Sequence, residues 1–143
     1  MKAFENTPIT KERFLHHLNW HKEKDSFMKG TYNNVYSKTF KGCAVGCSLN
    51  SIALELGEKI DFSDHSLYEK YLGVPEWLAR LEDTIFEGLP DNRSKLWAIE
   101  FGEAIKKGSD LNTIKAPFLI FVLESNLGRL QDEKFKEQRE AVE

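Results

Sequence analysis

The chain has 143 residues, of which 41% are hydrophobic and 30% charged, and this excludes a disordered or low-complexity polypeptide. It has 20 Lys and Arg residues and 23 Asp and Glu residues, so it lacks the excess of basic residues that is typical of a dedicated nucleic-acid binder. We therefore expect no nucleic-acid partner. Because it has two cysteines, no secretory leader and no apolar run near the roughly 18 residues that cross a bilayer, we expect a cytoplasmic protein with no membrane association.

The first predicted helix begins near Thr7-Pro8 and ends at Lys29. Thr can cap exposed amides, and Pro at the first helical position loses no hydrogen bond. One stripe of this helix contains apolar residues followed by an imidazole and a carboxylate: Phe14, Leu18, His21, Asp25 and Met28. We expect Asp25 to lie one turn from His21 and to orient its ring.

A polar loop or short hairpin is predicted over residues 30–42, with a turn at Asn33-Asn34. Tyr32 lies on this segment, which would be able to cover a pocket.

A second helix is predicted from Cys43 to Leu56, closed by Gly57. One of its sides carries Cys43, Cys47, Asn50 and Leu54, and we expect both sides to be buried. Ser63 is a good cap for a short helix that ends at Leu72.

Pro75 opens a further predicted helix that ends at Gly88. Its expected inward stripe is Leu78, Leu81 and Ile85. Residues 91–107 form another amphipathic segment, and the apolar run 118–123 suits a strand or a helix, with its length favouring helix. Residues 131–143 predict a charged, partly solvated helical tail.

Together these segments predict an all-α protein: a single compact domain over residues 1–143, with five to six helices and one polar loop after the first helix.

The candidate nucleophile is Cys43, in the first turn of the second predicted helix. The helix dipole and unpaired amides would lower its pKa, and Lys41 would add to that effect. The alternative is that Cys43 and Cys47 are small packing residues, which is the common fate of intracellular cysteines.

Two histidines are candidate bases for this thiol. His21 comes first because Asp25 can fix its tautomer, and His65 comes second. The alternatives are a buried, hydrogen-bonded His21-Asp25 pair and a helix cap formed by the residues around His65.

A zinc site could be formed by Cys43, Cys47, His17 and His21. However, a C-x3-C spacing inside a helix differs from the C-x2-C and C-x4-C spacings on turns that structural zinc sites usually have. We therefore predict no metal site and no cofactor. Three carboxylates of a predicted helix, Glu82, Asp83 and Glu87, are more typical of a solvated face than of a catalytic pair.

Several motifs resemble a family of small proteins encoded by bacteria and phages, for which we know of no established activity. The motifs are KGCAVGC at 41–47, DHxxYE at 64–69 and LEDxIFEGLP at 81–90, and the resemblance covers roughly residues 12 to 110. The segment GCAVGCSLNSIALELG is also similar to the helix that follows the cysteine of papain-like peptidases of the double-glycine leader type.

The expected site is a pocket in which Cys43 attacks a small polar substrate in acyl or related group transfer. His21 or His65 would act as base and Asp25 as the orienting group. Residues expected to bind the ligand are Tyr32, Lys41, Cys47 and Asn50. The alternative function is a non-catalytic module that binds a host protein or a small ligand through aromatic residues such as Trp20.

Overall fold

The computed structural model describes residues 1–32, 39–129 and 140 of the chain. Helices dominate this part of the molecule, which contains no β-strand, so the predicted all-α class is confirmed. The chain divides into two compact units, residues 1–109 and 110–143, where the sequence led us to expect one domain.

The described residues contain six α-helices and one 3-10 helix. In the first unit these are α1 (Lys11–Glu23), α2 (Ala44–Leu56), α3 (Leu67–Leu72), α4 (Glu76–Gly88) and α5 (Asp91–Ala104). In the second unit they are η1 (Leu111–Ile114) and α6 (Lys115–Arg129).

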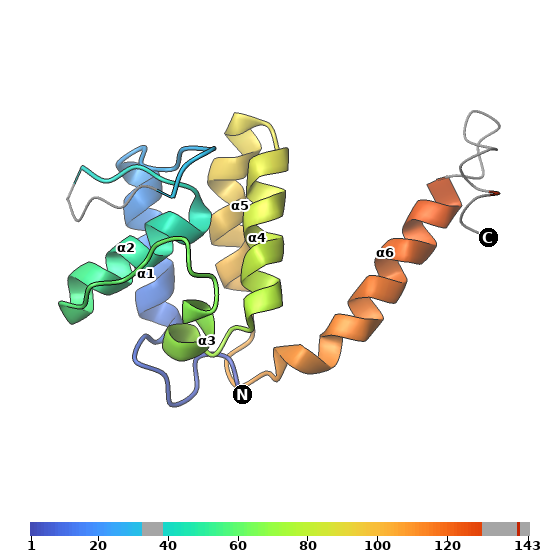
Figure 1. The fold of residues 1–143 in the computed structure, drawn as a ribbon, viewed down its shortest axis with the longest axis horizontal. Helices are drawn as coiled ribbons and strands as arrows, with labels where there is room; N and C mark the ends of the chain where they lie inside the picture. The colour runs from blue at the N-terminus through green and yellow to red at the C-terminus, as the bar shows by residue number, and fades with distance from the viewer. Residues whose placement is uncertain (33–38, 130–139, 141–143) are drawn as a thin grey trace. The chain divides into compact units, whose positions relative to one another are not determined.

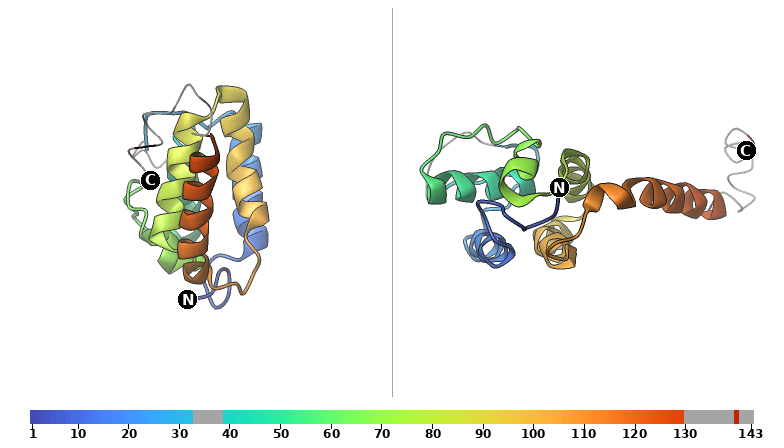
Figure 2. Two further views of the ribbon diagram at one scale, coloured as in Figure 1. Left: turned by 90° about the vertical axis from the view of Figure 1, so that its right-hand side faces the viewer. Right: turned by 90° about the horizontal axis from the view of Figure 1, so that it is seen from below.

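Four helices of the first unit enclose its core. Helix α2 packs against α1 and α4, and α5 closes the ring by packing against the same two helices. Figure 2 shows α1, α4 and α5 end-on in its right-hand view, with α2 lying lengthwise beside them. The ten residues from Ala44 to Ala53 are all buried, so the beginning of α2 lies inside the unit.

Helix α1 is shorter than predicted at both ends. It begins after Thr10, whose hydroxyl accepts a hydrogen bond from the Arg13 amide, while the Thr7 hydroxyl bonds to the Ile9 carbonyl instead. It ends at Glu23 because the backbone reverses at Asp25, which has a φ of 49°. The predicted boundaries at Thr7-Pro8 and Lys29 are therefore wrong.

The boundaries of α2 and α3 follow the predicted signals more closely. Both helices end at a glycine in the left-handed conformation, Gly57 and Gly73, which favours residues without a Cβ atom. The short helix starts after Ser66, three residues later than the expected cap at Ser63.

Helix α4 presents a different face to the core than the sequence predicts. Its buried residues are Ala79, Glu82, Asp83 and Phe86. The predicted inward stripe of Leu78, Leu81 and Ile85 is only partly buried, so that prediction is wrong. The rotation places two adjacent carboxylates inside the first unit.

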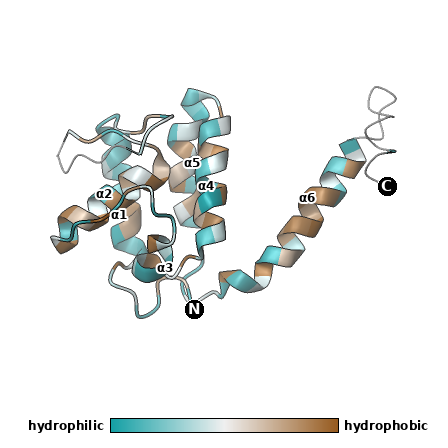
Figure 3. Ribbon diagram, in the orientation of Figure 1, coloured by the Kyte–Doolittle hydropathy of each residue, from teal (hydrophilic) through white to brown (hydrophobic). Residues whose placement is uncertain are grey.

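In the second unit, α6 confirms the helical prediction for residues 118–123. None of its described residues is buried, and four large apolar side chains are exposed: Leu119, Ile120, Phe121 and Leu123. Figure 3 shows this apolar stretch along α6. The predicted turn at Asn33-Asn34 and nearly all of the predicted tail at 131–143 lie outside the described residues.

Among the described residues, no helix combines the length and the apolar character needed to cross a membrane.

Candidate functional site

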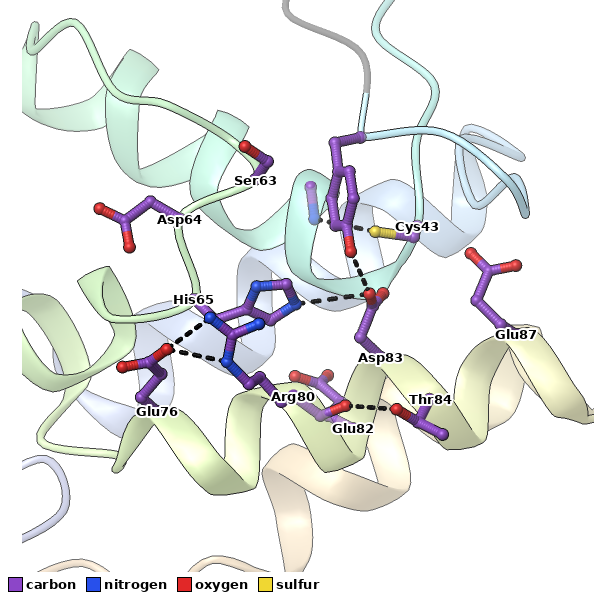
Figure 4. A network of polar contacts seen from close by, with 12 residues as sticks. Cys43, Ser63, Asp64, His65, Glu76, Arg80, Glu82, Asp83, Thr84 and Glu87 are labelled. Carbon is purple, nitrogen blue, oxygen red and sulfur yellow. Dashed lines mark hydrogen bonds and ion pairs between the residues drawn. The ribbon is translucent and has the colours of Figure 1, made fainter.

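A buried carboxylate, that of Asp83 on α4, is the centre of a polar cluster inside the first unit (Figure 4). The Tyr32 hydroxyl donates a hydrogen bond to Oδ2 of Asp83 at 2.6 Å. Nε2 of His65, which precedes α3, lies 3.4 Å from the same oxygen. Asp83 is therefore shared by two side chains that belong to distant parts of the chain.

The thiol of Cys43 lies beside this carboxylate. Cys43 is the residue that precedes α2, and its Sγ accepts a hydrogen bond from the Gly46 amide at 3.4 Å. Sγ and carboxylate oxygens of Asp83 and Glu87 all lie within 4.8 Å of one another. The Cys43 residue is 1% exposed, so its thiol is enclosed in the described structure.

Close backbone contacts hold Tyr32 next to the thiol. The Thr31 carbonyl accepts a hydrogen bond from the Cys43 amide at 2.8 Å. A Cβ atom added to Gly46 would lie 2.7 Å from the Tyr32 carbonyl oxygen, so only glycine permits this approach. The second glycine of the KGCAVGC motif therefore permits the close contact between α2 and Tyr32.

The electrostatics of the cluster keep the proton on sulfur and the charge on Asp83. Burial opposes ionisation of Asp83, but hydrogen bonds from His65 and Tyr32 outweigh it and lower the pKa of this carboxyl. Burial, and then the negative charge of Asp83, raise the pKa of Cys43. The prediction of a lowered Cys43 pKa is thus wrong: desolvation and a neighbouring anion outweigh the helix dipole.

A second carboxyl group, Glu82, lies on the interior side of the same helix. Glu82 is fully buried, and burial raises its pKa to about 8. Burial and then Glu82 also raise the pKa of Tyr68 on α3. The two adjacent carboxyls therefore differ at neutral pH, with Glu82 protonated and Asp83 ionised.

The predicted pair of His21 and Asp25 does not form. Asp25 is exposed and pairs with Lys95 of α5. His21 is completely buried, and its Nε2 is hydrogen-bonded to Oγ of Ser51 at 2.8 Å. The role of Asp25 as an orienting group is therefore corrected, because the reversed backbone at Asp25 directs its carboxylate to the surface.

The remaining predicted ligand residues lie in different surroundings. Lys41 is exposed and lines a separate cavity of about 390 Å³ together with Asp25 and Lys95. Cys47 is buried, and its thiol donates to the Gly42 carbonyl at 3.3 Å. Asn50 is also buried, and neither of its side-chain polar atoms has a hydrogen-bond partner in the described structure. Of the predicted site residues, the structure brings together Cys43, His65 and Tyr32.

The sequence does not predict the central role of Asp83, because three carboxylates on one helix are more typical of a solvated face. One signal was available in its neighbour Glu82, which lies four residues after Leu78 and four before Phe86 and so falls within the apolar side of the helix. A carboxyl group at such a position indicates a buried polar cluster. Nothing in the sequence pairs Asp83 with Tyr32, because that contact depends on the packing of three separate segments.

No family model matches the chain, and neither curated proteins nor solved structures yielded a match. The function therefore has to be argued from the cluster itself.

Proposed function

We propose that the protein is an enzyme of acyl or related group transfer on a small polar substrate, with Cys43 as its nucleophile. One observation carries the proposal: a thiol at the beginning of a buried helix lies beside an ionised carboxylate that also binds an imidazole and a phenol. A nucleophile, a proton acceptor and groups that orient the acceptor are the parts that nucleophilic catalysis requires.

In the proposed reaction, Sγ of Cys43 attacks the carbonyl carbon of the substrate. As the carbon–sulfur bond forms, the sulfur becomes acidic enough to give its proton to Asp83, which does not take it from the resting thiol. The bond to the leaving group then breaks, and the proton moves from Asp83 to the leaving group. The negative charge that develops on the carbonyl oxygen is stabilised by the N-terminal amides of α2. Water then attacks the thioester, and Asp83 accepts a proton from that water. The carbon–sulfur bond breaks, the carboxylic acid leaves, and the Cys43 sulfur regains the proton from Asp83.

His65 and Tyr32 position the base in this scheme. His65 is buried and bonded to Asp83, so it fixes the carboxylate, and it replaces His21 as the histidine of the site. Tyr32 is half-buried and holds the second contact to Oδ2. Since Cys43 is enclosed, substrate entry requires Tyr32 to move away from the thiol.

The test uses p-nitrophenyl acetate, a reactive ester that reports acyl transfer to any accessible nucleophile. We expect a burst of p-nitrophenolate and an acetyl group on the peptide that contains Cys43, detected by mass spectrometry. The Cys43→Ala variant should lose the adduct, and the Cys47→Ala variant, which removes the other buried thiol, should retain it. Acetylation of surface lysines with Cys43 unmodified would refute the proposal.

Hydrolysis of the thioester is tested separately, by the lifetime of the acetyl-Cys43 intermediate. Asp83→Asn removes the carboxylate that the scheme assigns to accept a proton from water, so the acetyl-Cys43 intermediate should persist about 100-fold longer than in the wild type. A purely structural Asp83 would leave the lifetime of this thioester unchanged.

A second candidate function, binding of a small ligand, is favoured by a cavity of about 780 Å³ beside Trp20. It is lined by His16, His17, Trp20, Lys24, Thr39, Ser51, Leu54 and Glu55. An aromatic wall with a few polar groups is typical of ligand pockets. Fluorescence of 1-anilinonaphthalene-8-sulfonate should rise with the wild type and much less with Trp20→Ala, and equal responses would exclude this cavity.

A further inference from the structure

We propose that Cys43, Asp83 and Glu87 form a binding site for a divalent metal ion of the zinc class. The three residues offer one sulfur and two carboxylate oxygens within 4.8 Å of one another. Ligand atoms around a tetrahedral zinc ion are separated by about 3.5 Å, so a modest inward shift of each side chain would complete three coordination positions.

Helix α4 and the Gly30 amide position the two carboxylate ligands of this site. Asp83 and Glu87 are four residues apart on α4, so both carboxylates lie on the same side of the helix. Figure 4 shows both of them next to the Cys43 sulfur. The Gly30 amide lies 3.0 Å from each Glu87 oxygen and donates to this carboxylate, which directs an otherwise exposed side chain toward the cluster.

A second observation is an unsatisfied carboxylate oxygen within the cluster, although the other oxygen of Asp83 is bonded to Tyr32 and His65. Asp83 is only 8% exposed, and its Oδ1 atom is buried with no hydrogen-bond partner in the part of the chain that the structure describes. Within the same part, neither Asp83 nor Glu87 forms an ion pair with a lysine or arginine. A buried carboxylate oxygen without a donor is costly, and a bound cation would satisfy it.

The donor set selects the kind of metal. Mg²⁺ and Ca²⁺ prefer oxygen ligands only, whereas Zn²⁺ accepts thiolate sulfur together with carboxylate oxygen. Three protein ligands leave a fourth zinc position for water. The ligands also differ from the sequence-based Cys43-Cys47-His17-His21 set, since the Cys47 thiol bonds to the carbonyls of Gly42 and Ser26.

Zinc at this position would regulate the proposed reaction, and this part of the inference rests on the proposed function. The ion would engage the sulfur that attacks the substrate and the carboxylate that accepts its proton. Bound zinc therefore inhibits acyl transfer, and its removal restores it.

The test is a competition between the reduced, metal-free, full-length protein and the chromophoric chelator 4-(2-pyridylazo)resorcinol for Zn²⁺. We expect the wild type to remove one equivalent from the chelator. Cys43→Ser and Glu87→Gln should each weaken zinc binding at least about tenfold. Cys47→Ala and Glu76→Gln are matched controls for a buried thiol and an α4 carboxylate, and they should bind zinc like the wild type.

Two results would overturn the zinc site: a wild type that cannot compete with the chelator, or a Glu87→Gln variant that binds as tightly as the wild type. Glu87 is exposed, so this substitution does not depend on preserving the core. The acetylation assay, run with and without Zn²⁺, separates the two proposals. Zinc binding without acetylation of the metal-free protein would refute the enzyme but keep the metal site, and acetylation that zinc does not suppress would refute the regulation.

Discussion

At the scale of single residues, Gly46 decides how closely the Tyr32 segment approaches the thiol. In Gly46→Ala, the new Cβ atom would lie 2.7 Å from the Tyr32 carbonyl oxygen. Overpacking of this kind lowers the free energy of unfolding by about 1 to 3 kcal/mol. Replacing a helical glycine by alanine raises it by about 1 kcal/mol, because alanine has the higher helix propensity. We therefore expect Gly46→Ala to lower the free energy of unfolding by up to about 2 kcal/mol in urea denaturation.

The matched control is Gly88→Ala at the end of α4. No atom lies within 4 Å of the position where its Cβ would be, so we expect this variant to be as stable as the wild type or more stable by up to about 1 kcal/mol. A Gly46→Ala protein that gains stability like Gly88→Ala would contradict the close approach of Tyr32.

His21 gives the protein a specific dependence on pH. Burial, followed by the charge of His17, lowers its pKa to about 4, whereas an unfolded histidine titrates near about 6.5. Between these pH values the unfolded chain binds a proton at His21 that the folded chain does not. The stability that depends on neutral His21 is therefore complete above about pH 6.5 and is lost as the pH falls toward 4. The decline due to His21 should reach roughly 3 kcal/mol.

Urea denaturation at several pH values, with His21→Gln as the comparison, measures this contribution. The variant should lose less stability than the wild type between pH 6.5 and 4, whatever its stability at neutral pH. Parallel curves for the two proteins would show that His21 does not titrate differently in the folded state.

Part of the site could be predicted from single residues. Cys43 and His65 were identified because a thiol before a helix and a histidine near a helix cap are local features. The direction of the Cys43 pKa shift was not predictable locally, because it is set by burial and by Asp83, forty residues away. The predicted partner of His21 is wrong because its hydrogen-bond partner, Ser51, belongs to another helix.

At the scale of elements, the orientation of α4 determines whether its carboxylates reach the interior. Phe86 is 1% exposed, whereas the adjacent Ile85 is only partly buried. We expect Phe86→Ala to cost roughly 3 to 5 kcal/mol and Ile85→Ala roughly 1 kcal/mol in free energy of unfolding. Equal costs, or a larger cost at Ile85, would indicate that α4 packs by the face that the sequence suggests.

The number and order of helices were largely predictable, because Gly57, Gly73 and Pro75 mark ends and beginnings directly. The end of α1 was not predictable, because the backbone reverses at Asp25 with a positive φ. Aspartate adopts a positive φ only at some positions, and no feature of the sequence marks this one. The face of α4 was not predictable from its apolar stripe, because the first unit buries carboxylates there in place of Leu81 and Ile85.

At the scale of the whole molecule, residues 1–109 contain nearly all of the core. The two ends of this unit are joined by hydrogen bonds from the Ala3 amide to Ser109 and from the Gly108 amide to Ala3. Helix α6 contributes no buried residue. We expect a fragment of residues 1–109 to unfold cooperatively, with a free energy of unfolding within about 1 kcal/mol of the full chain.

Near-ultraviolet circular dichroism and urea denaturation of this fragment measure the prediction. A fragment with helical far-ultraviolet spectra but no near-ultraviolet signal would show that the second unit is needed for fixed packing of the first.

The contact between Cys43 and Asp83 is the basis of both proposals, and the rate of Cys43 alkylation by iodoacetamide at pH 8 tests it most directly. Asp83→Asn removes the charge that raises the Cys43 pKa and one of the groups that bind Tyr32, so Cys43 should react at least about tenfold faster than in the wild type. Asp91→Asn, which removes an exposed carboxylate at the start of α5, should leave the rate unchanged. An Asp83→Asn protein whose Cys43 reacts no faster than that of the wild type would contradict the arrangement on which the account depends.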